Sequence, residues 1–439
     1  MNTSGLPLYL AAVACIGFGG IYLYRKSLEH CLLYILYALP LMGLLATKTS
    51  LGGFKIFDLL SIGCLALFPK TFFRGLSSLS RSTGWLFLAF VLLLLIGSLA
   101  SEFPQTSLLA LLQVLPAFVY CRLLVVVCYV NPTFYSQVLR ALRFSSYLLL
   151  VFIAVQLVVG LSFTFYPALN QNTYDPLHDT IRYPGFFHDS QASGQFLAIA
   201  SFLFLYSSRD EKSLKQKLLH LGLFAACGVG VLLSGSRSAL GGLLVGMVLL
   251  LLCGGWRLQV SVLSLGILVG SLYLLASPNL AILNRADNID EDYKFRQSVW
   301  QEAWDISLNN PGLGIGIGNF QSYTSMHKQE LYLEIDDEIV YFDQPENGYL
   351  KVLTEIGFVG FGIFLSFLLR PAGKTLIGFY NKTLDYKVLF ILAAFTGWLF
   401  SFNTVYSLFD SRITIVVATL LALLITHPIK DGFLNEQAS

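Results

Sequence analysis

Arg237 lies where a cation would meet a phosphate group. It belongs to the run Ser-Gly-Ser-Arg-Ser at 234–238, between two apolar segments with almost no connecting loop. A guanidinium group donates paired hydrogen bonds to a diphosphate, and the hydroxyls of Ser236 and Ser238 and the start of the next helix add further donors. We predict that this run binds a diphosphate-like anion. The alternative is an arginine that extends from a helix end to the membrane interface.

Arg296 is a second candidate for the same anion. The stretch 294–306 has the apolar spacing of an amphipathic helix that lies at the membrane surface or on a helix bundle, and Arg296 lies beside its apolar stripe. That stripe consists of Phe295, Val299, Ala303 and Ile306. The alternative is a solvent-facing ion pair with Asp292, four positions earlier. Arg285 is a weaker candidate for binding the anion from the same loop.

Glu346 and Asn347 precede an apolar stretch that begins near residue 348. Asn347 has the side chain of a helix N-cap, and the helix dipole favours an anion at this end. We predict that Glu346 is a general base for a hydroxyl group and that Asn347 helps to bind the substrate. The alternative for Glu346 is an acid that only stabilises the helix start. Lys351 and Glu355 lie four positions apart and would pair.

Glycine alternates with Leu or Ile at 312–318, and Asn319 follows. The run does not follow a strand as a dinucleotide-binding motif does, and no Gly-Lys-Ser or Gly-Lys-Thr follows it, so a phosphate-binding loop is excluded. Two interpretations remain. The run is a tight connection between helices, or Gly316, Gly318 and Asn319 line the approach to a bulky ligand.

Arg182, within the run Ile-Arg-Tyr-Pro-Gly-Phe-Phe at 181–187, would add a third cationic contact. The histidines show neither His-x-His nor His-Glu-x-x-His spacing, which argues against a metal site. All seven cysteines lie in or beside apolar segments without a Cys-x-x-Cys pair. They indicate packing residues and no disulfide framework.

The composition indicates the kind of fold that must position these residues. Of 439 residues, 55% are hydrophobic and only 12% are charged, and the net charge is +2. Soluble proteins carry about 25% charged residues, so a soluble enzyme, a coiled coil and a disordered chain are excluded. The apolar stretches do not alternate with period two as in a membrane barrel. The sequence predicts an all-α, polytopic helical membrane protein with about 12–14 transmembrane helices.

Thirteen apolar stretches are candidate membrane spans, and the first is interpreted as a helix rather than a cleaved signal peptide. They lie at about 7–24, 29–47, 51–69, 83–100, 106–130, 145–167, 193–208, 218–235, 238–255, 258–277, 348–370, 387–407 and 412–428.

Charge orients the spans. More than half of the 28 Lys and Arg residues lie in loops that follow odd-numbered spans, so these loops face the cytoplasm by the positive-inside rule. The chain then divides into residues 1–277, with ten spans and a short periplasmic loop at 168–192, a large periplasmic loop at 278–347, and residues 348–439, with three spans and a cytoplasmic tail. The large loop holds half of the 26 acidic residues, and we expect the chemistry there.

Four motifs together give the chain a resemblance to the O-antigen ligase/polymerase superfamily (Wzy C-terminal type) of bacterial envelope enzymes. They are Arg-Tyr-Pro-Gly-Phe-Phe at 182–187, Ser-Arg-Ser at 236–238 before a glycine-containing apolar helix, Arg…Trp…Ala…Pro-x-x-Gly-x-Gly-x-Gly-Asn-Phe from Arg296 to Phe320, and Asn-x-Tyr-Leu…Glu-x-Gly from Asn347 to Gly357.

The resemblance implies a metal-independent glycosyltransferase of the GT-C class that needs no cofactor. Such enzymes take a glycan from undecaprenyl diphosphate at the periplasmic face of the bacterial inner membrane. By matching motif, Arg237 and Arg296 would hold the donor diphosphate and stabilise the charge that develops on it. The implied partners are this lipid-linked donor, a glycan acceptor, membrane lipids and a regulator of chain length, and no nucleic acid.

The position of Glu346 separates two branches of that superfamily. Ligases, which join the glycan to lipid A–core, typically have a histidine at this place. Glu-Asn at 346–347 is more similar to the polymerases, which join one lipid-linked repeat unit to another. We therefore expect an O-antigen or exopolysaccharide polymerase, with a ligase as the alternative. A lipid-linked oligosaccharide flippase or transporter is an alternative of another class, but such proteins tend to contain internal repeats.

Overall fold

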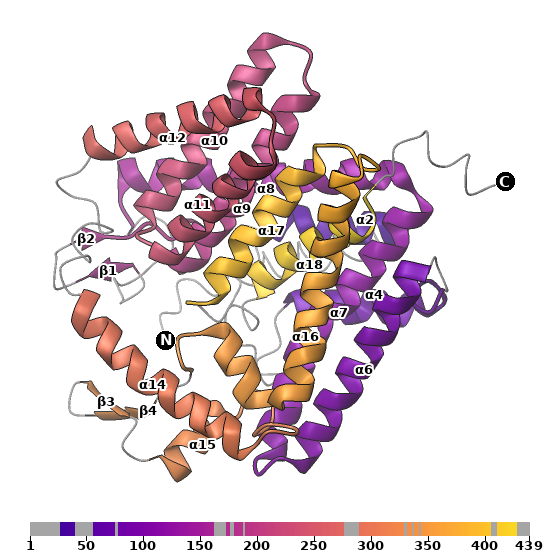
Figure 1. The fold of residues 1–439 in the computed structure, drawn as a ribbon, viewed down its shortest axis with the longest axis vertical. Coiled ribbons are helices and arrows are strands. Elements are labelled where there is room, and N and C mark those ends of the chain that lie inside the picture. The colour runs from indigo at the N-terminus through magenta and orange to yellow at the C-terminus, as the bar shows by residue number, and fades with distance from the viewer. Residues whose placement is uncertain are drawn as a thin grey trace, which may run out of the picture.

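The computed structural model describes residues 27–39, 56–74, 78–161, 173–175, 180–187, 189–275, 289–328, 332–335, 338–341, 344–404 and 411–427. Most of these residues are helical (Figure 1). The helices are α2 (Leu28–Tyr37), α4 (Ile56–Leu67), α5 (Pro69–Phe72), α6 (Ser78–Ala100), α7 (Pro104–Val130), α8 (Pro132–Val159), α9 (Ser190–Asp210), α10 (Leu214–Leu233), α11 (Arg237–Cys253), α12 (Trp256–Leu275), α14 (Ile289–Asn309), α15 (Phe320–His327), α16 (Gly348–Tyr380), α17 (Val388–Phe402) and α18 (Ser411–Ile425).

Two small antiparallel hairpins accompany the helices. Strands β1 (Tyr174–Asp175) and β2 (Thr180–Ile181) form one of them, in the shorter predicted loop. Strands β3 (Tyr332–Ile335) and β4 (Glu338–Tyr341) form the other, in the large predicted loop, with Tyr332 opposite Tyr341. Neither hairpin belongs to the helix bundle.

The helices agree with the predicted spans. Helices α7, α8, α10 and α16 are each long and apolar enough to cross a membrane. Every predicted span other than the first overlaps an apolar helix, and the first, at 7–24, lies outside the described residues. The prediction of an all-α multi-pass membrane protein is confirmed.

Two helices, α8 and α16, extend ten residues or more beyond a predicted end. Helix α8 begins at Pro132 rather than near residue 145, because the Asn131 side chain accepts a hydrogen bond from the Thr133 amide (3.2 Å) and proline suits the first helical position. Helix α16 continues past residue 370 to Tyr380, and its backbone is kinked at Gly357.

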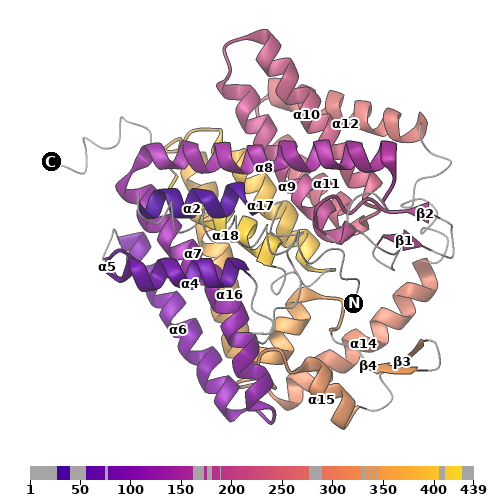
Figure 2. The same cartoon turned by 180° about the vertical axis from the view of Figure 1, so that it is seen from behind.

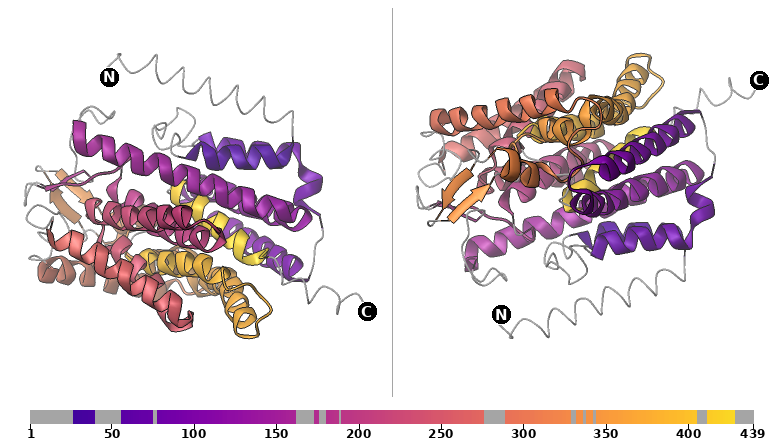
Figure 3. Two further views of the ribbon diagram at one scale, coloured as in Figure 1. Left: turned by 90° about the horizontal axis from the view of Figure 1, so that it is seen from above. Right: turned by 90° about the horizontal axis from the view of Figure 1, so that it is seen from below.

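The helices form two groups that share α17 and α18. Figure 1 shows α6, α7 and α16 on one side and α9, α10, α11 and α12 on the other. Helix α17 packs on α9 and α11, and α18 packs on α7, α16 and α17. Helix α8 crosses the back of the molecule beside α2 (Figure 2), and most helices run side by side when seen from above and below (Figure 3).

Small residues bring α11 and α17 into close contact. A Cβ atom on Gly242 would lie 2.5 Å from the carbonyl oxygen of Gly397, so the two backbones touch where only glycine fits. At the same contact, the Ser401 hydroxyl donates to the carbonyl oxygen of Ser238 (2.9 Å). This packing fixes the N-terminal end of α11, where Arg237 lies.

Candidate active site

Arg296 and Glu346 form an ion pair. Nη2 of Arg296 lies 3.6 Å from Oε2 of Glu346, and the side chains are 32% and 39% exposed. The structure therefore brings together two of the three predicted catalytic residues, which are fifty positions apart in the chain. Both side chains are partly exposed to solvent.

The pair forms because α14 runs alongside α16 in the same direction. Along both helices from N- to C-terminus, Arg296 first faces Glu346, and Ser307 then contacts Thr354. Thr354 Oγ1 lies 3.0 Å from Ser307 Oγ and donates to the carbonyl oxygen of Ala303 (3.1 Å). Ser307 and Thr354 are fully buried. These hydrogen bonds set the register that places Arg296 opposite the start of α16.

The apolar stripe of α14 completes this contact. Val299, Ala303 and Ile306 are buried, as predicted for an amphipathic helix that lies on the helix bundle, and the side chain of Phe295 lies outside the described part of the structure. Helix α14 ends at Asn309, two residues before Pro311. Arg296 lies seven positions before Ala303, which is two helical turns, and so shares the face that meets α16.

The glycine run forms a tight connection against the kink of α16. Gly314, Gly316 and Gly318 all have positive φ angles, of 69°, 93° and 77°. The amide of Gly316 donates to the carbonyl oxygen of Glu355 (2.9 Å). A Cβ atom on Gly314 would lie 2.5 Å from the carbonyl carbon of Glu355. Close backbone packing thus accounts for these glycines, and ligand contacts by Gly316 and Gly318 stay a prediction.

Asn319 closes the glycine run. Its side chain is fully buried, and its Nδ2 atom donates to the carbonyl oxygen of Ile315 (2.9 Å). Its amide donates to the carbonyl oxygen of Gly316 (3.2 Å). Asn319 stabilises the turn before α15, and its predicted role in substrate binding is untested.

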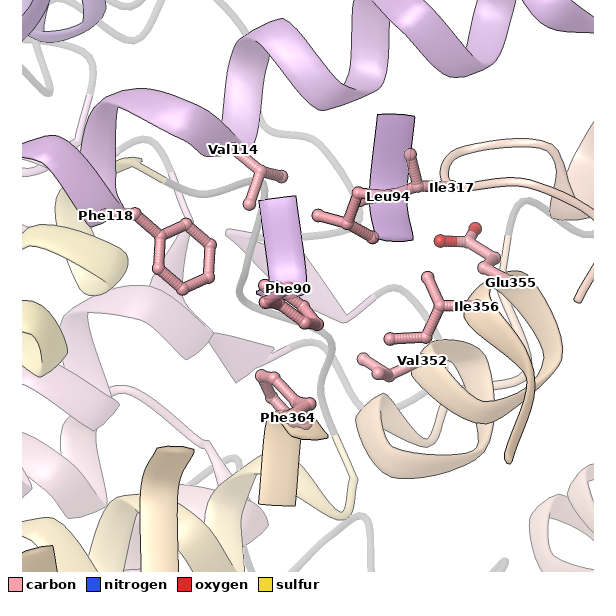
Figure 4. A pocket seen from close by; sticks show the side chains of 9 residues that line it. All are labelled: Phe90, Leu94, Val114, Phe118, Ile317, Val352, Glu355, Ile356 and Phe364. Carbon is pink, nitrogen blue, oxygen red and sulfur yellow. The ribbon is translucent and has the colours of Figure 1, made fainter. Parts of the chain in front are cut away.

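The predicted Lys351–Glu355 pair is present and lies inside the protein. Lys351 Nζ is 3.9 Å from Glu355 Oε1, and the Glu355 side chain is 1% exposed. The backbone amides of Gly318 and Phe320 donate to the Glu355 carboxylate. The carboxylate reaches into a narrow cavity that is otherwise lined by apolar side chains of α6, α7, α16 and Ile317 (Figure 4). Glu355 thereby ties the glycine run to α16.

The start of α16 is fixed by Asn347, and its predicted N-cap role is confirmed. The Asn347 side chain accepts a hydrogen bond from the Leu350 amide (3.1 Å) and donates to Oδ1 of Asn403 (3.2 Å). Glu346, just before the cap, has a φ of 52°, in the left-handed region that a glutamate seldom adopts. The fixed cap and this unusual backbone angle hold Glu346 beside α14.

Arg237 is the first residue of α11, at the N-terminal end that the sequence predicts. Ser236 is the N-cap, and its Oγ accepts a hydrogen bond from the Ala239 amide (3.3 Å). The hydroxyls of Ser236 and Ser238 lie 3.1 Å apart. Arg237 is partly exposed, whereas both serines are buried.

Arg182 lies under this run rather than on the surface. Its side chain is 3% exposed, and its Nε atom donates to the carbonyl oxygen of Ser234 (3.1 Å). The amide of Tyr183 donates to the carbonyl oxygen of Leu233 (3.2 Å). Arg182 therefore supports the segment that presents Arg237, and a direct contact between Arg182 and substrate stays a prediction. Arg285 lies outside the described residues.

The C-terminal end of α17 connects the two halves of the site. Ser401 is hydrogen-bonded to Ser238 at the start of α11, and Asn403 is hydrogen-bonded to Asn347 at the start of α16. The 182–187 segment, the starts of α11 and α16 and the end of α17 thus form one connected belt, and Arg296 of α14 joins it through Glu346.

The structure adds Arg412 to this belt. Its Nη1 atom donates to the carbonyl oxygen of Phe187, and its guanidinium carbon lies 5.4 Å from the centre of the Phe187 ring. The sequence offers one signal for this residue: an arginine at the first position of the last apolar span (412–428), at the end that the charge pattern places outside. Its contact with residue 187 could not be foreseen.

A comparison with protein families identifies the segment that carries most of the site. Residues 222–365 match the family model described as O-antigen ligase. This range includes the serine–arginine run, α14, the glycine run and the start of α16. No curated protein matches the chain.

Proposed function

We propose that this chain, which residues 222–365 assign to the O-antigen ligase/polymerase superfamily, is a GT-C glycosyltransferase that polymerises undecaprenyl-diphosphate-linked repeat units of O-antigen or exopolysaccharide. The single observation that carries the proposal is the Arg296–Glu346 pair. It joins a cation suited to a leaving diphosphate with a carboxylate suited to an attacking hydroxyl.

In the proposed reaction, an acceptor hydroxyl oxygen attacks the anomeric carbon of the donor sugar. The new glycosidic bond forms, the bond between that carbon and the diphosphate oxygen breaks, and its electron pair leaves with undecaprenyl diphosphate. Glu346 takes the hydroxyl proton. The reaction balances without a metal or a cofactor.

Arg296 and Arg237 would stabilise the departing diphosphate. Negative charge grows on its oxygens in the transition state, and preorganised guanidinium donors bind that charge more strongly than they bind the ground state. Arg237 lies at the positive end of α11, whose dipole adds to the attraction.

A carboxylate at position 346 favours the polymerase over the ligase. The ligases of this superfamily typically have a histidine there, and histidine titrates near neutral pH. The ligase remains the second candidate because the matching family model carries the description O-antigen ligase. In that case the acceptor is lipid A–core rather than a second lipid-linked repeat.

The proposal includes a location and partners. The active site would face the periplasm from the bacterial inner membrane, which the charge pattern of the loops in the sequence supports. The partners are the lipid-linked donor, the glycan acceptor and a regulator of chain length.

A gel of surface glycans from a strain without this gene tests the proposal. A polymerase predicts core lipid that carries a single repeat unit and no ladder. A bare core with long polymer on undecaprenyl diphosphate would instead identify a ligase. An unchanged ladder would reject both.

A further inference from the structure

The proposed function places two competing demands on the charge of Arg296. Its guanidinium faces Glu346 in the structure, yet the proposed reaction needs it for the donor diphosphate. The carboxylate likewise faces a cation when the reaction needs it for a hydroxyl proton. Arg296 cannot bind the diphosphate, and Glu346 cannot accept the proton, while the two side chains stay paired with each other.

The Arg296–Glu346 contact is weak enough for a diphosphate to replace Glu346 as the partner of Arg296. A separation of 3.6 Å is longer than a charge-assisted hydrogen bond of about 2.7–2.9 Å, so the attraction is mainly electrostatic. Both side chains are about one-third exposed, and water screens such pairs. A diphosphate carries more negative charge than one carboxylate and offers two oxygens to the guanidinium fork.

We propose that Glu346 is an internal counter-ion for Arg296, which the donor diphosphate displaces on binding. This inference rests on the proposed function. Displacement frees the Glu346 carboxylate to accept the proton of the acceptor hydroxyl. The donor therefore binds first, and the base becomes available only when a glycan is in place to be transferred.

The backbones on both sides stay fixed during this exchange. The start of α16 is held by the hydrogen bonds of Asn347 to Leu350 and Asn403. Helix α14 is held by the buried Ser307–Thr354 contact. Only the two side chains need to rotate, so the released carboxylate remains next to the bound diphosphate.

Binding of inorganic pyrophosphate to the purified full-length protein in lipid nanodiscs tests the inference by calorimetry. Glu346→Gln removes the internal competitor and should tighten binding by about two- to fivefold, the range expected for losing an exposed ion pair. Arg296→Ala removes the binding cation and should weaken binding about tenfold or more. The two members of one ion pair thus have effects of opposite sign.

Glu302→Gln is the matched control. Glu302 lies on α14 and pairs with Lys328 at 2.5 Å, so its removal takes one negative charge from the same helix without touching Arg296. It should leave pyrophosphate binding unchanged. Glu346→Asn is a second variant in case the glutamine variant does not fold, because asparagine tolerates a left-handed φ.

The outcomes separate the inference from the proposed function. Unchanged or weaker binding in both Glu346 variants, with binding still lost in Arg296→Ala, overturns the counter-ion role and leaves the proposed function standing. Equal tightening in Glu302→Gln also overturns it, because the effect is then one of general charge. Unchanged binding in Arg296→Ala would show that Arg296 does not bind the diphosphate, which rejects this part of the proposed function and with it the inference.

Discussion

The hydroxyl groups of Ser307 and Thr354 lie 3.0 Å apart in the buried contact between α14 and α16. This contact lies about three helical turns from Arg296 along α14 and about two turns from Glu346 along α16. Because an α-helix is stiff over two or three turns, the hydroxyl contact determines where Arg296 stands relative to Glu346. The buried Ser307–Thr354 contact thus positions the partly exposed Arg296–Glu346 pair.

Thr354→Val should impair transfer through this alignment. Valine keeps the shape of threonine but removes the hydroxyl group that contacts Ser307 and the carbonyl oxygen of Ala303, which costs about 0.5–1.5 kcal/mol of stability. We expect a lower melting temperature in detergent and shorter glycans. Thr354→Ser keeps a hydroxyl group and should restore chain length. Full-length glycans with Thr354→Val would show that the contact does not align the site.

Arg237→Ala and Arg296→Ala should each reduce chain growth by about 10²–10³-fold, the usual cost of removing one donor that stabilises transition-state charge. The protein should still reach the membrane, as immunoblotting of membrane fractions would show. Arg140→Ala, at an exposed arginine of α8 far along the chain from the site, is the control and should support a normal ladder. Normal glycan lengths in either site variant would reject the assignment.

Gly314→Ala should prevent correct folding of the loop. The residue has a φ of 69°, and a Cβ atom would lie 2.5 Å from the Glu355 backbone. We expect a loss of more than about 1–2 kcal/mol from the backbone angle alone, seen as early thermal unfolding and low yield. Gly312→Ala is the matched control, because a Cβ atom there meets no atom within 4 Å. Equal stability of the two variants would contradict the close-packing account.

Gly242→Ala should separate α11 from α17. The added methyl group would lie 2.5 Å from the carbonyl oxygen of Gly397, so the helices must move apart and Arg237 moves with them. We expect loss of both thermal stability and chain growth. Gly222→Ala in α10, where a Cβ atom meets nothing within 4 Å, should behave as the unaltered protein in the same two assays.

Arg412→Ala should loosen the 182–187 segment. The variant loses a charged hydrogen bond to the carbonyl oxygen of Phe187 and a contact with its ring, together about 1–3 kcal/mol. We expect partial loss of chain growth and faster proteolysis at this segment. Arg412→Lys keeps the charge and should give an intermediate result. A wild-type proteolysis pattern for Arg412→Ala would show that the contact is dispensable.

The sequence was sufficient for features that depend on neighbouring residues. The apolar stretches predicted the helices because the length of an apolar run and its period reflect the local surroundings of the chain. The N-cap role of Asn347 and the apolar stripe of α14 are local in the same sense. The starts of helices were predicted less well from the sequence. Helix α8, for example, begins after the Asn131 cap, well before its apolar stretch.

The tertiary structure alone decided which residues meet. Arg296 reaches Glu346 across fifty positions, and Arg412 reaches Phe187 across 225. No spacing in the sequence encodes these contacts, because they depend on how helix surfaces fit together. Packing also gave the glycine run its role, since Gly314 has a positive φ angle and lies against the backbone of α16, while Gly316 and Gly318 lie against Ser101 and Ala110. The sequence by itself determined the chemistry available to the site, and helix packing decided how that chemistry is arranged.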